Sequence, residues 1–178
     1  DIQAAVDTLR CGGLILYPTD TIWGIGCDAT NEEAVKRIFA LKQRADSKAL
    51  ICLVDNANRL PRYIRNIPDV EYAEKPLTLI LDNAVNLPSC LMAEDGSIGM
   101  RVTRENISNK LCFKFQKPVV STSANISGEP SPQCFSEISP EIIAGVDYVM
   151  KCRQNDTSKR APSRIIKLRA DGEVKIIR

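Results

Sequence analysis

The chain has 178 residues, of which 44% are hydrophobic and 26% are charged, and its formal net charge is +2. This is the composition of an ordinary globular protein, and the length favours a single domain that spans residues 1–178. A sequence pI near 8.2 is too low to indicate a nucleic-acid-binding protein by itself, since such domains usually exceed about 9. The chain contains no histidine, which excludes Ser-His-Asp and Cys-His catalysis and removes the commonest metal ligand, and no metal site is predicted.

The cysteines and the apolar runs indicate the compartment. Seven cysteines are widely spaced and form no C-x-x-C pair, so we expect reduced thiols, several of them buried, in a cytoplasmic protein. No apolar run approaches the 18 residues that a membrane span needs. The chain begins at Asp1 without a basic, signal-like segment, which we interpret as a trimmed terminus.

The first part of the chain predicts two helices separated by a strand and a polar loop. Apolar residues recur at helical spacing through residues 2–9, and residues 14–18 then indicate a short buried strand. The stretch "TDTIWGIGCDA" (19–29) is rich in hydroxyl groups and glycine and predicts a loop. A T-x-x-E capping box begins at Thr30, and the apolar face that follows predicts a second helix ending near residues 42–44.

The middle of the chain predicts four strands and one helix. The strands are apolar or alternating runs bounded by polar residues, at 49–54, 77–81, 97–103 and 118–125. Apolar residues at helical spacing predict the helix across 107–115. Asp55 is expected to cap the segment that follows the first of these strands.

The last part of the chain predicts short strands at "DYVMK" (147–151), "SRIIKL" (163–168) and "EVKIIR" (173–178). The polar run at 153–160 between them predicts a mobile loop. Strands and helices alternate through most of the chain, and strands cluster at its end. This order predicts an α/β domain built around a mixed sheet.

The stretch "YPTDTIWGIG" is the first candidate site. Thr19, Asp20 and Thr21 follow a predicted strand, and ligands of open α/β sheets bind where strands end. Gly24 and Gly26 permit a close approach of the backbone. A glycine-rich connector explains the stretch about equally well, and neither the G-x-G-x-x-G fingerprint nor a Walker A motif is present.

The stretch "LKQRADSKAL" places Lys42, Arg44 and Lys48 at the end of a predicted helix. Taken alone, it favours cations that complement the helix dipole and face solvent. The functional alternative is an anion site, since an arginine fork and lysine ammonium groups suit phosphate or carboxylate.

Two further stretches carry polar groups beside apolar strands. "STSANISGEPSP" (121–132) is dense in hydroxyl groups, which fits either a polar turn or a site for phosphates or a polar small molecule. A serine hydrolase fits poorly, because no histidine base and no G-x-S-x-G spacing is present. In "SIGMRV", Arg101 lies within an apolar strand and is expected either to point to solvent or to meet an anion.

Taken together, these stretches resemble the YrdC-like family of threonylcarbamoyl-AMP synthases. The family's YPTDT-x-YGLG, K-x-R, R-V-P, TSAN-x-SG and PST-like segments and its late arginine have counterparts here in the same order. They are "YPTDTIWGIG", "LKQRADSKAL", "SIGMRVT", "STSANISGEPSP", "APSRIIKL" and "KIIR". The resemblance covers almost the whole chain, which makes it more specific than any single motif.

The resemblance implies an α/β fold in which a twisted mixed sheet with flanking helices surrounds a concave, positively charged cavity. It implies condensation of L-threonine, bicarbonate and ATP into threonylcarbamoyl-AMP, with release of pyrophosphate and with Mg²⁺ accompanying the nucleotide. This is the first step of the threonylcarbamoyl modification of adenosine 37 in tRNA. Expected partners are therefore tRNA and the machinery that transfers the threonylcarbamoyl group.

The resemblance also assigns roles to residues of this chain. Lys42 and Arg44 are expected to be catalytic, because they would offset negative charge on the triphosphate and the carbamate. Expected threonine contacts are Thr21, Arg101, Ser123 and Ser163. Expected ATP contacts are Arg44, Lys48, Ser97, Asn125 and Arg178.

The chain departs from the family pattern at several positions. Trp23 stands where tyrosine is usual, and Ala45 and Thr103 each replace a proline. Arg164 replaces the threonine of the PST segment. The stretch "EKPLT", which ends at Thr78, replaces PGPLT.

Two alternatives to the synthase remain open at this stage. One is a module that binds tRNA or double-stranded RNA without chemistry, for which a net charge of +2 is modest. The other is a related domain that acts on a different carbamoylated nucleotide.

Overall fold

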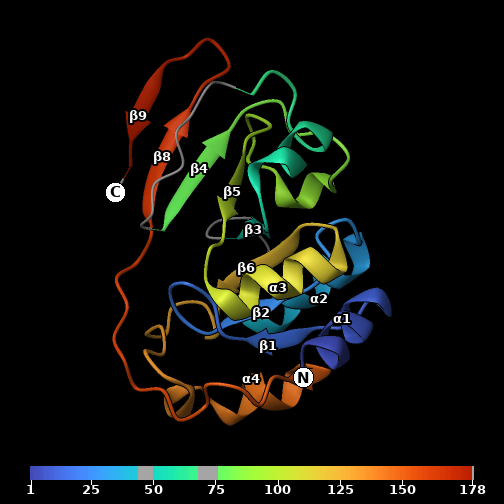
Figure 1. Ribbon diagram of the computed structural model, residues 1–178, viewed down its shortest axis with the longest axis vertical. Helices are drawn as coiled ribbons and strands as arrows, with labels where there is room; N and C mark the ends of the chain where they lie inside the picture. The colour runs from blue at the N-terminus through green and yellow to red at the C-terminus, as the bar shows by residue number, and fades with distance from the viewer. Residues whose placement is uncertain (44–49, 68–75, 178) are drawn as a thin grey trace.

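The structure is a computed structural model, which describes residues 1–43, 50–67 and 76–177. Its described strands are β1 (Ile15–Tyr17), β2 (Gly24–Gly26), β3 (Ile51–Val54), β4 (Leu77–Leu81), β5 (Ile98–Val102), β6 (Val119–Ser123), β7 (Tyr148–Val149), β8 (Arg164–Leu168) and β9 (Val174–Ile176). They form a nine-stranded sheet in the order β7-β1-β2-β6-β3-β5-β4-β8-β9 (Figure 1). The pairs β1–β7, β3–β5 and β4–β8 are parallel and the other neighbours are antiparallel, which confirms the predicted α/β fold with a mixed sheet.

The helices lie mainly beside one half of the sheet. They are α1 (Ile2–Arg10), α2 (Glu32–Lys42), α3 (Asn106–Phe115) and α4 (Pro140–Gly145), with 3₁₀ turns at η1 (Ala57–Arg62), η2 (Ser89–Leu91) and η3 (Phe135–Glu137). Figure 1 shows α1, α2, α3 and α4 around β1, β2 and β6, while β4, β5, β8 and β9 extend the sheet away from them. Residues 150–163 run along one side of the molecule, from the helix-covered end of the sheet to the end that contains β8 and β9.

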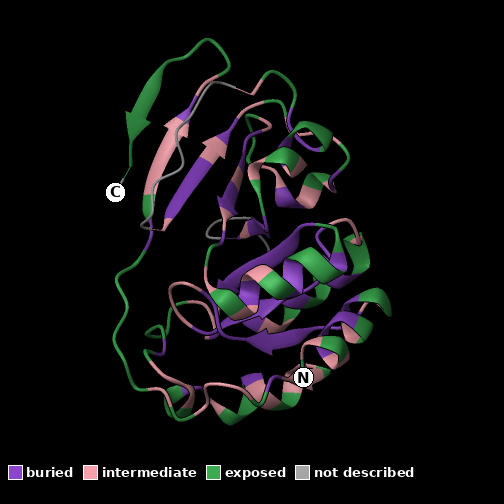
Figure 2. Cartoon of the chain, in the orientation of Figure 1, coloured by how far each residue is buried: buried purple, intermediate pink, exposed green. Residues whose placement is uncertain are grey.

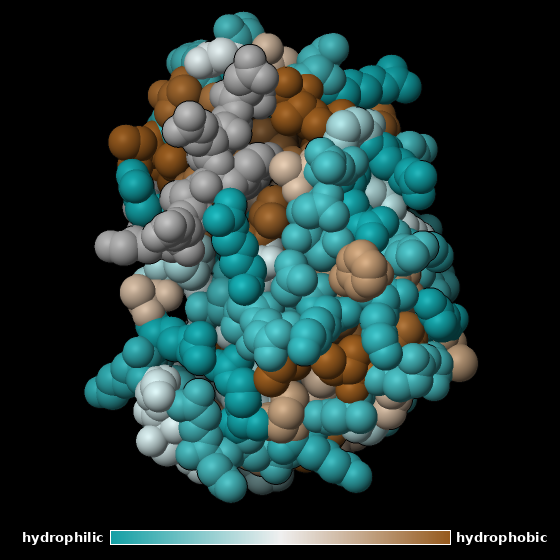
Figure 3. All heavy atoms as spheres, in the orientation of Figure 1, coloured by the Kyte–Doolittle hydropathy of each residue, from teal (hydrophilic) through white to brown (hydrophobic). Residues whose placement is uncertain are grey.

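The core follows this arrangement. The strands β1 and β2 are buried along their whole length, and α1 buries Ala5, Val6 and Leu9 (Figure 2). By contrast, every residue of β9 is exposed. Large exposed hydrophobic side chains include Val174 and Ile176, and hydrophobic atoms gather at that end of the face in Figure 3. The apolar core therefore extends from β1 as far as β4, which is mostly buried, and burial is lost at the β9 edge of the sheet.

The strand β2 corrects the prediction of a loop over residues 19–29. Gly24 pairs with both Tyr17 of β1 and Ser123 of β6, so the glycine-rich stretch lies inside the sheet. A Cβ atom at Gly26 would lie 2.6 Å from the Tyr17 ring and 2.8 Å from the Val120 carbonyl oxygen. Glycine is required at this position because the neighbouring strands approach closely, whereas the glycine-rich composition of the stretch suggested a turn.

Two predicted helix caps are also wrong by one residue. Asn31, rather than Thr30, caps α2 by accepting a hydrogen bond from the backbone N–H of Ala34 at 3.2 Å. Similarly, the Asn56 side chain caps η1, while the Asp55 carboxylate forms an ion pair with Arg59. In each case two adjacent residues had suitable side chains, and local spacing did not decide between them.

The cysteines agree with the prediction of reduced thiols, several of them buried. All seven cysteines lie within the described residues and are free thiols, of which Cys27, Cys52 and Cys112 are buried. Burial raises the pKa of the Cys52 thiol to about 12, which makes it a poor nucleophile. Across the described part of the chain, no helix has the length and apolar character needed to cross a membrane.

Candidate functional site

A cavity of about 430 Å³ lies between the two ends of the molecule. Side chains from the β1–β2 loop, β4, β5, β6 and the segment before β8 line it. All four residues that the resemblance assigns to threonine are among them: Thr21, Arg101, Ser123 and Ser163. These residues are far apart in sequence, so the fold brings them together, while their roles remain predictions.

The loop after β1 is held in place by its own hydroxyl groups. Thr19 is buried, and its hydroxyl donates to the Ile22 carbonyl oxygen at 2.7 Å. The Thr19 hydroxyl oxygen in turn accepts a hydrogen bond from the backbone N–H of Thr21 at 3.1 Å. This local turn fixes the backbone so that Thr21 lines the cavity while Asp20 faces Arg101.

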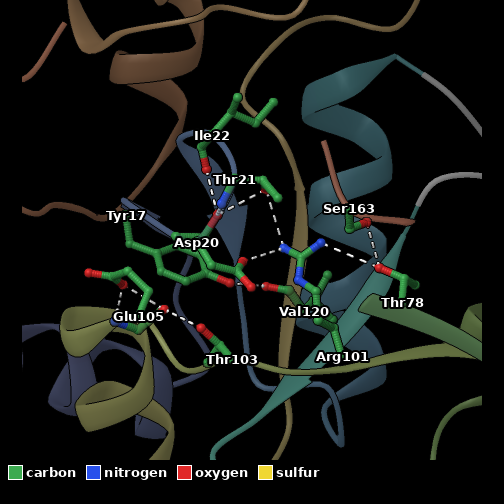
Figure 4. Close-up of polar contacts among 12 residues, drawn as sticks. Tyr17, Asp20, Thr21, Ile22, Thr78, Arg101, Thr103, Glu105, Val120 and Ser163 are labelled. Atoms are coloured by element: carbon green, nitrogen blue, oxygen red, sulfur yellow. Dashed lines mark hydrogen bonds and ion pairs between the residues drawn. The ribbon is translucent and has the colours of Figure 1, made fainter. Parts of the chain in front are cut away.

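Arg101 of β5 is only 5% exposed and forms a 3.0 Å ion pair with Asp20 (Figure 4). Its two terminal nitrogens also donate to the hydroxyls of Thr21 and Thr78, each at 3.4 Å. The structure thus decides between the two expectations for Arg101: it meets an anion, and that anion belongs to the protein. Burial raises the pKa of the Asp20 carboxyl above its ordinary value, and the charge of Arg101 opposes that shift.

Thr78 joins two strands at the cavity wall. Its hydroxyl lies 2.8 Å from the hydroxyl of Ser163, and both residues are buried. Thr78 was not among the predicted site residues, because the stretch before it departs from the family pattern. Its place in a strand end that lines the cavity is the signal that could have identified it.

Lys42, at the end of α2, is only 2% exposed and points into the protein. Its ammonium nitrogen donates to the Ser123 carbonyl oxygen at 2.6 Å, to the Ser123 hydroxyl at 3.2 Å and to the Asn125 side-chain oxygen at 3.4 Å. The Asn125 amide in turn donates to two backbone carbonyls of its own turn. Lys42 therefore fixes two other predicted contact residues and is not among the side chains that line the cavity.

Three predicted site residues, Arg44, Lys48 and Arg178, lie outside the described residues. Ser97 is described and lines a neighbouring cavity of about 310 Å³, which shares Thr78, Ile51 and Ile165 with the first. The Ser97 hydroxyl donates to Asp95 at 2.5 Å. The predicted ATP contacts are thus divided between an adjoining cavity, the turn around Asn125 and positions that the structure does not describe.

Further residues line the main cavity without having been predicted as contacts. Trp23 is one, and its ring packs against Phe135 with centroids 5.0 Å apart, so it forms an aromatic wall at the usual tyrosine position. Arg160 is another, contributed by the polar run that predicted only a loop. It lies 3.7 Å from Asp156 of the same run. Nothing in the sequence of the polar run at 153–160 indicated that Arg160 would line the cavity.

Comparison with known proteins identifies the family to which the chain belongs. The sequence profile of the Sua5/YciO/YrdC family, described as telomere recombination, matches residues 7–178. The chain belongs to this family. A threonylcarbamoyl-AMP synthase of Pseudoalteromonas translucida is 36% identical over 155 residues, which is 83% of each chain. A protein of the same name from Stenotrophomonas maltophilia is 32% identical over 171 residues, which is 92% of each chain.

Solved structures of the family have the same fold. The Sua5 protein of P. abyssi in complex with L-threonine is 27% identical, with a TM-score of 0.81, over 94% of this chain and 50% of that one. E. coli YciO is 25% identical, with a TM-score of 0.79, over 99% of this chain and 87% of that one. This chain therefore spans about half the length of the Sua5 protein and most of YciO.

Proposed function

We propose that this protein is an L-threonylcarbamoyladenylate synthase, which condenses L-threonine, bicarbonate and ATP and releases pyrophosphate. The observation that carries the proposal is the cavity where Thr21, Arg101, Ser123 and Ser163 meet from four separate segments. The names of the relatives and the L-threonine complex of P. abyssi Sua5 support the same assignment.

The proposed chemistry requires no protein nucleophile. The amine of threonine attacks bicarbonate to give a carbamate and water, and the carbamate oxygen then attacks the α-phosphate of ATP, displacing pyrophosphate. The protein contributes by holding polar ligands in line and by neutralising charge. A chain without histidine can perform this reaction, because no step relies on an imidazole base.

In this proposal, Arg101 and the hydroxyls around it receive the amino acid. Arginine offers a planar fork for a carboxylate, and Arg101 is held at the wall by Thr21 and Thr78. Lys42 acts by positioning Ser123 and Asn125, to which it is bonded. The proposed phosphate contacts of Arg44, Lys48 and Arg178 rest on the sequence resemblance alone.

Magnesium is expected to accompany the ATP. Among the described residues, no group of three or more cysteine, aspartate or glutamate side chains is placed to hold a metal ion. In this proposal the ion would be held largely by phosphate oxygens and water, as nucleotide-bound Mg²⁺ often is. Its chemistry would be to offset phosphate charge, which adds to what the basic side chains do.

We further propose that residues 1–178 act as one domain in the cytoplasm. The product would pass to machinery that transfers the threonylcarbamoyl group to adenosine 37 of tRNA. The proposal for tRNA as a partner rests on the family resemblance, and the modest net charge of +2 argues against RNA binding as the sole role.

The test is pyrophosphate release in the presence of ATP, bicarbonate and each amino acid in turn. Release that depends on threonine supports the synthase. A folded Arg44→Ala variant should lose this release by orders of magnitude, and near-normal release would contradict the role of Arg44. Lack of release with every amino acid, together with salt-sensitive RNA binding, would instead favour a binding module.

A further inference from the structure

Asp20 and Arg101 form a pair of opposite charges beside the cavity. Their closest charged atoms are 3.0 Å apart, and their side chains are only 10% and 5% exposed. Arg101 lines the cavity, whereas Asp20 is not among the described residues that do. Any carboxylate that binds to Arg101 must therefore share the guanidinium with a carboxylate of the protein (Figure 4).

The guanidinium cannot turn away from Asp20 without losing other bonds. One of its terminal nitrogens contacts both Asp20 and the Thr21 hydroxyl, and the other donates to Thr78. Thr78 is itself bonded to Ser163 across the wall. The structure thus keeps the two charges side by side, and the pair contributes no net charge to the site.

A ligand changes this balance in a way that depends on its own charges. A simple carboxylate would place two negative groups around one buried cation, which is costly where water is largely excluded. A zwitterionic amino acid also carries an ammonium group, which the Asp20 carboxylate attracts. Glu105 and Arg160 also act on Asp20, with opposite signs: Glu105 raises the pKa of the Asp20 carboxyl and Arg160 lowers it.

We propose that Asp20 makes this cavity selective for a zwitterionic amino acid over the same acid without its ammonium group. Asp20 determines specificity through its charge beside Arg101, and it takes no part in the chemical reaction. The proposal rests on the proposed function only in placing threonine in this cavity. It adds a residue and a physical reason for selecting α-amino acids.

The test compares two ligands of nearly the same shape by calorimetric titration without ATP: L-threonine and 3-hydroxybutyrate, which lacks the amino group. The wild-type protein should bind L-threonine at least about tenfold more tightly. Asp20→Asn should weaken L-threonine binding by about tenfold or more and strengthen 3-hydroxybutyrate binding, because one negative charge beside Arg101 is removed.

Two further variants serve as controls. Asp55→Asn removes the carboxylate of another largely buried ion pair, with Arg59, that does not line the cavity, and should leave both affinities unchanged. Asp20→Glu keeps the charge and should retain the preference for threonine. Circular dichroism of each variant shows whether it is folded.

Each outcome decides the proposal. If Asp20→Asn binds both ligands more weakly by the same factor, Asp20 only positions Arg101. If both affinities stay unchanged, Asp20 has no role in selecting the ligand. Either result overturns the inference. If Asp20→Asn does not fold, wild-type protein that binds both ligands equally still overturns it. Threonine selectivity through Asp20 without pyrophosphate release would overturn the proposed function alone, and failure to bind threonine would overturn both.

Discussion

The ammonium nitrogen of Lys42 lies 2.6 Å from the backbone carbonyl oxygen of Ser123, 81 residues further along the chain. This contact joins the end of α2 to the end of β6. It also explains why a lysine at a helix terminus is almost fully buried. The dipole explanation for this basic stretch is therefore incomplete, since Lys42 donates hydrogen bonds to a turn that borders the cavity and orders it.

Replacing Lys42 with methionine should lower both stability and activity. The apolar stem is kept, while the bonds to Ser123 and Asn125 are lost and their oxygens stay poorly solvated. We expect the free energy of unfolding to fall by about 1–3 kcal/mol, measured by urea denaturation. Lys36→Met is the control, because Lys36 is exposed on the same helix and has an exposed Glu32 partner at 3.9 Å. Equal effects of the two variants would contradict the role given to Lys42.

Gly26→Ala should destabilise the fold. The added methyl group would lie 2.6 Å from the ring of Tyr17 and 2.8 Å from a backbone carbonyl oxygen of β6, and the backbone cannot move without disturbing the pairing of β2. Overpacking of this kind costs about 1–3 kcal/mol. Thermal unfolding followed by circular dichroism measures the change, and an unaltered midpoint would show that β2 is not held this tightly.

Arg101→Met should destabilise the protein in a pH-dependent way. It leaves Asp20 buried without its guanidinium partner, and loss of such a partner typically costs about 3–5 kcal/mol. The pKa of Asp20 is already raised by burial, and removal of Arg101 raises it further. When a carboxyl has a higher pKa in the folded than in the unfolded state, the folded protein loses stability as pH rises through that pKa. The difference in the free energy of unfolding between wild type and Arg101→Met should therefore grow with pH.

Urea denaturation of wild type and Arg101→Met across the acidic and neutral range measures this trend. Adding Asp20→Asn to Arg101→Met should recover part of the loss and remove its pH dependence. A deficit that is the same at every pH would show that the Asp20 charge is not its cause.

Asp95→Asn should reduce stability at neutral pH but not in strong acid. Lys167 and Ser97 donate hydrogen bonds to Asp95 and lower the pKa of its carboxyl. Stability gained from a lowered pKa is present above the ordinary value of 3.8 and declines as pH falls toward the folded-state value. Denaturation midpoints of the two proteins should therefore converge below about pH 4. A constant difference would contradict this assignment.

The resemblance to the family assigned four residues of the site to threonine, and these roles remain predictions. Thr21, Arg101, Ser123 and Ser163 were each selected from separate stretches, and the fold places them in one cavity. What local patterns could not predict was which internal partner each would take. The pairing of Arg101 with Asp20, or of Lys42 with Ser123, depends on strand register and helix placement across 80 or more residues.

The fold was predicted least well where composition and packing disagree. The glycines of β2 suggest a loop, yet the crowded strands around Gly26 exclude any side chain. The short helix α4 was not predicted, because its six residues are too few to show a period. Similarly, Asn31 and Asn56 were passed over as caps in favour of Thr30 and Asp55, which are equally suited by residue type.

The most direct test of the central claim is identification of the product. The protein is incubated with ATP, L-threonine and ¹³C-bicarbonate, and the adenylates are analysed by mass spectrometry. We predict threonylcarbamoyl-AMP that carries the label from bicarbonate, formed in step with pyrophosphate. Folded protein that binds threonine but yields no labelled adenylate would contradict the account.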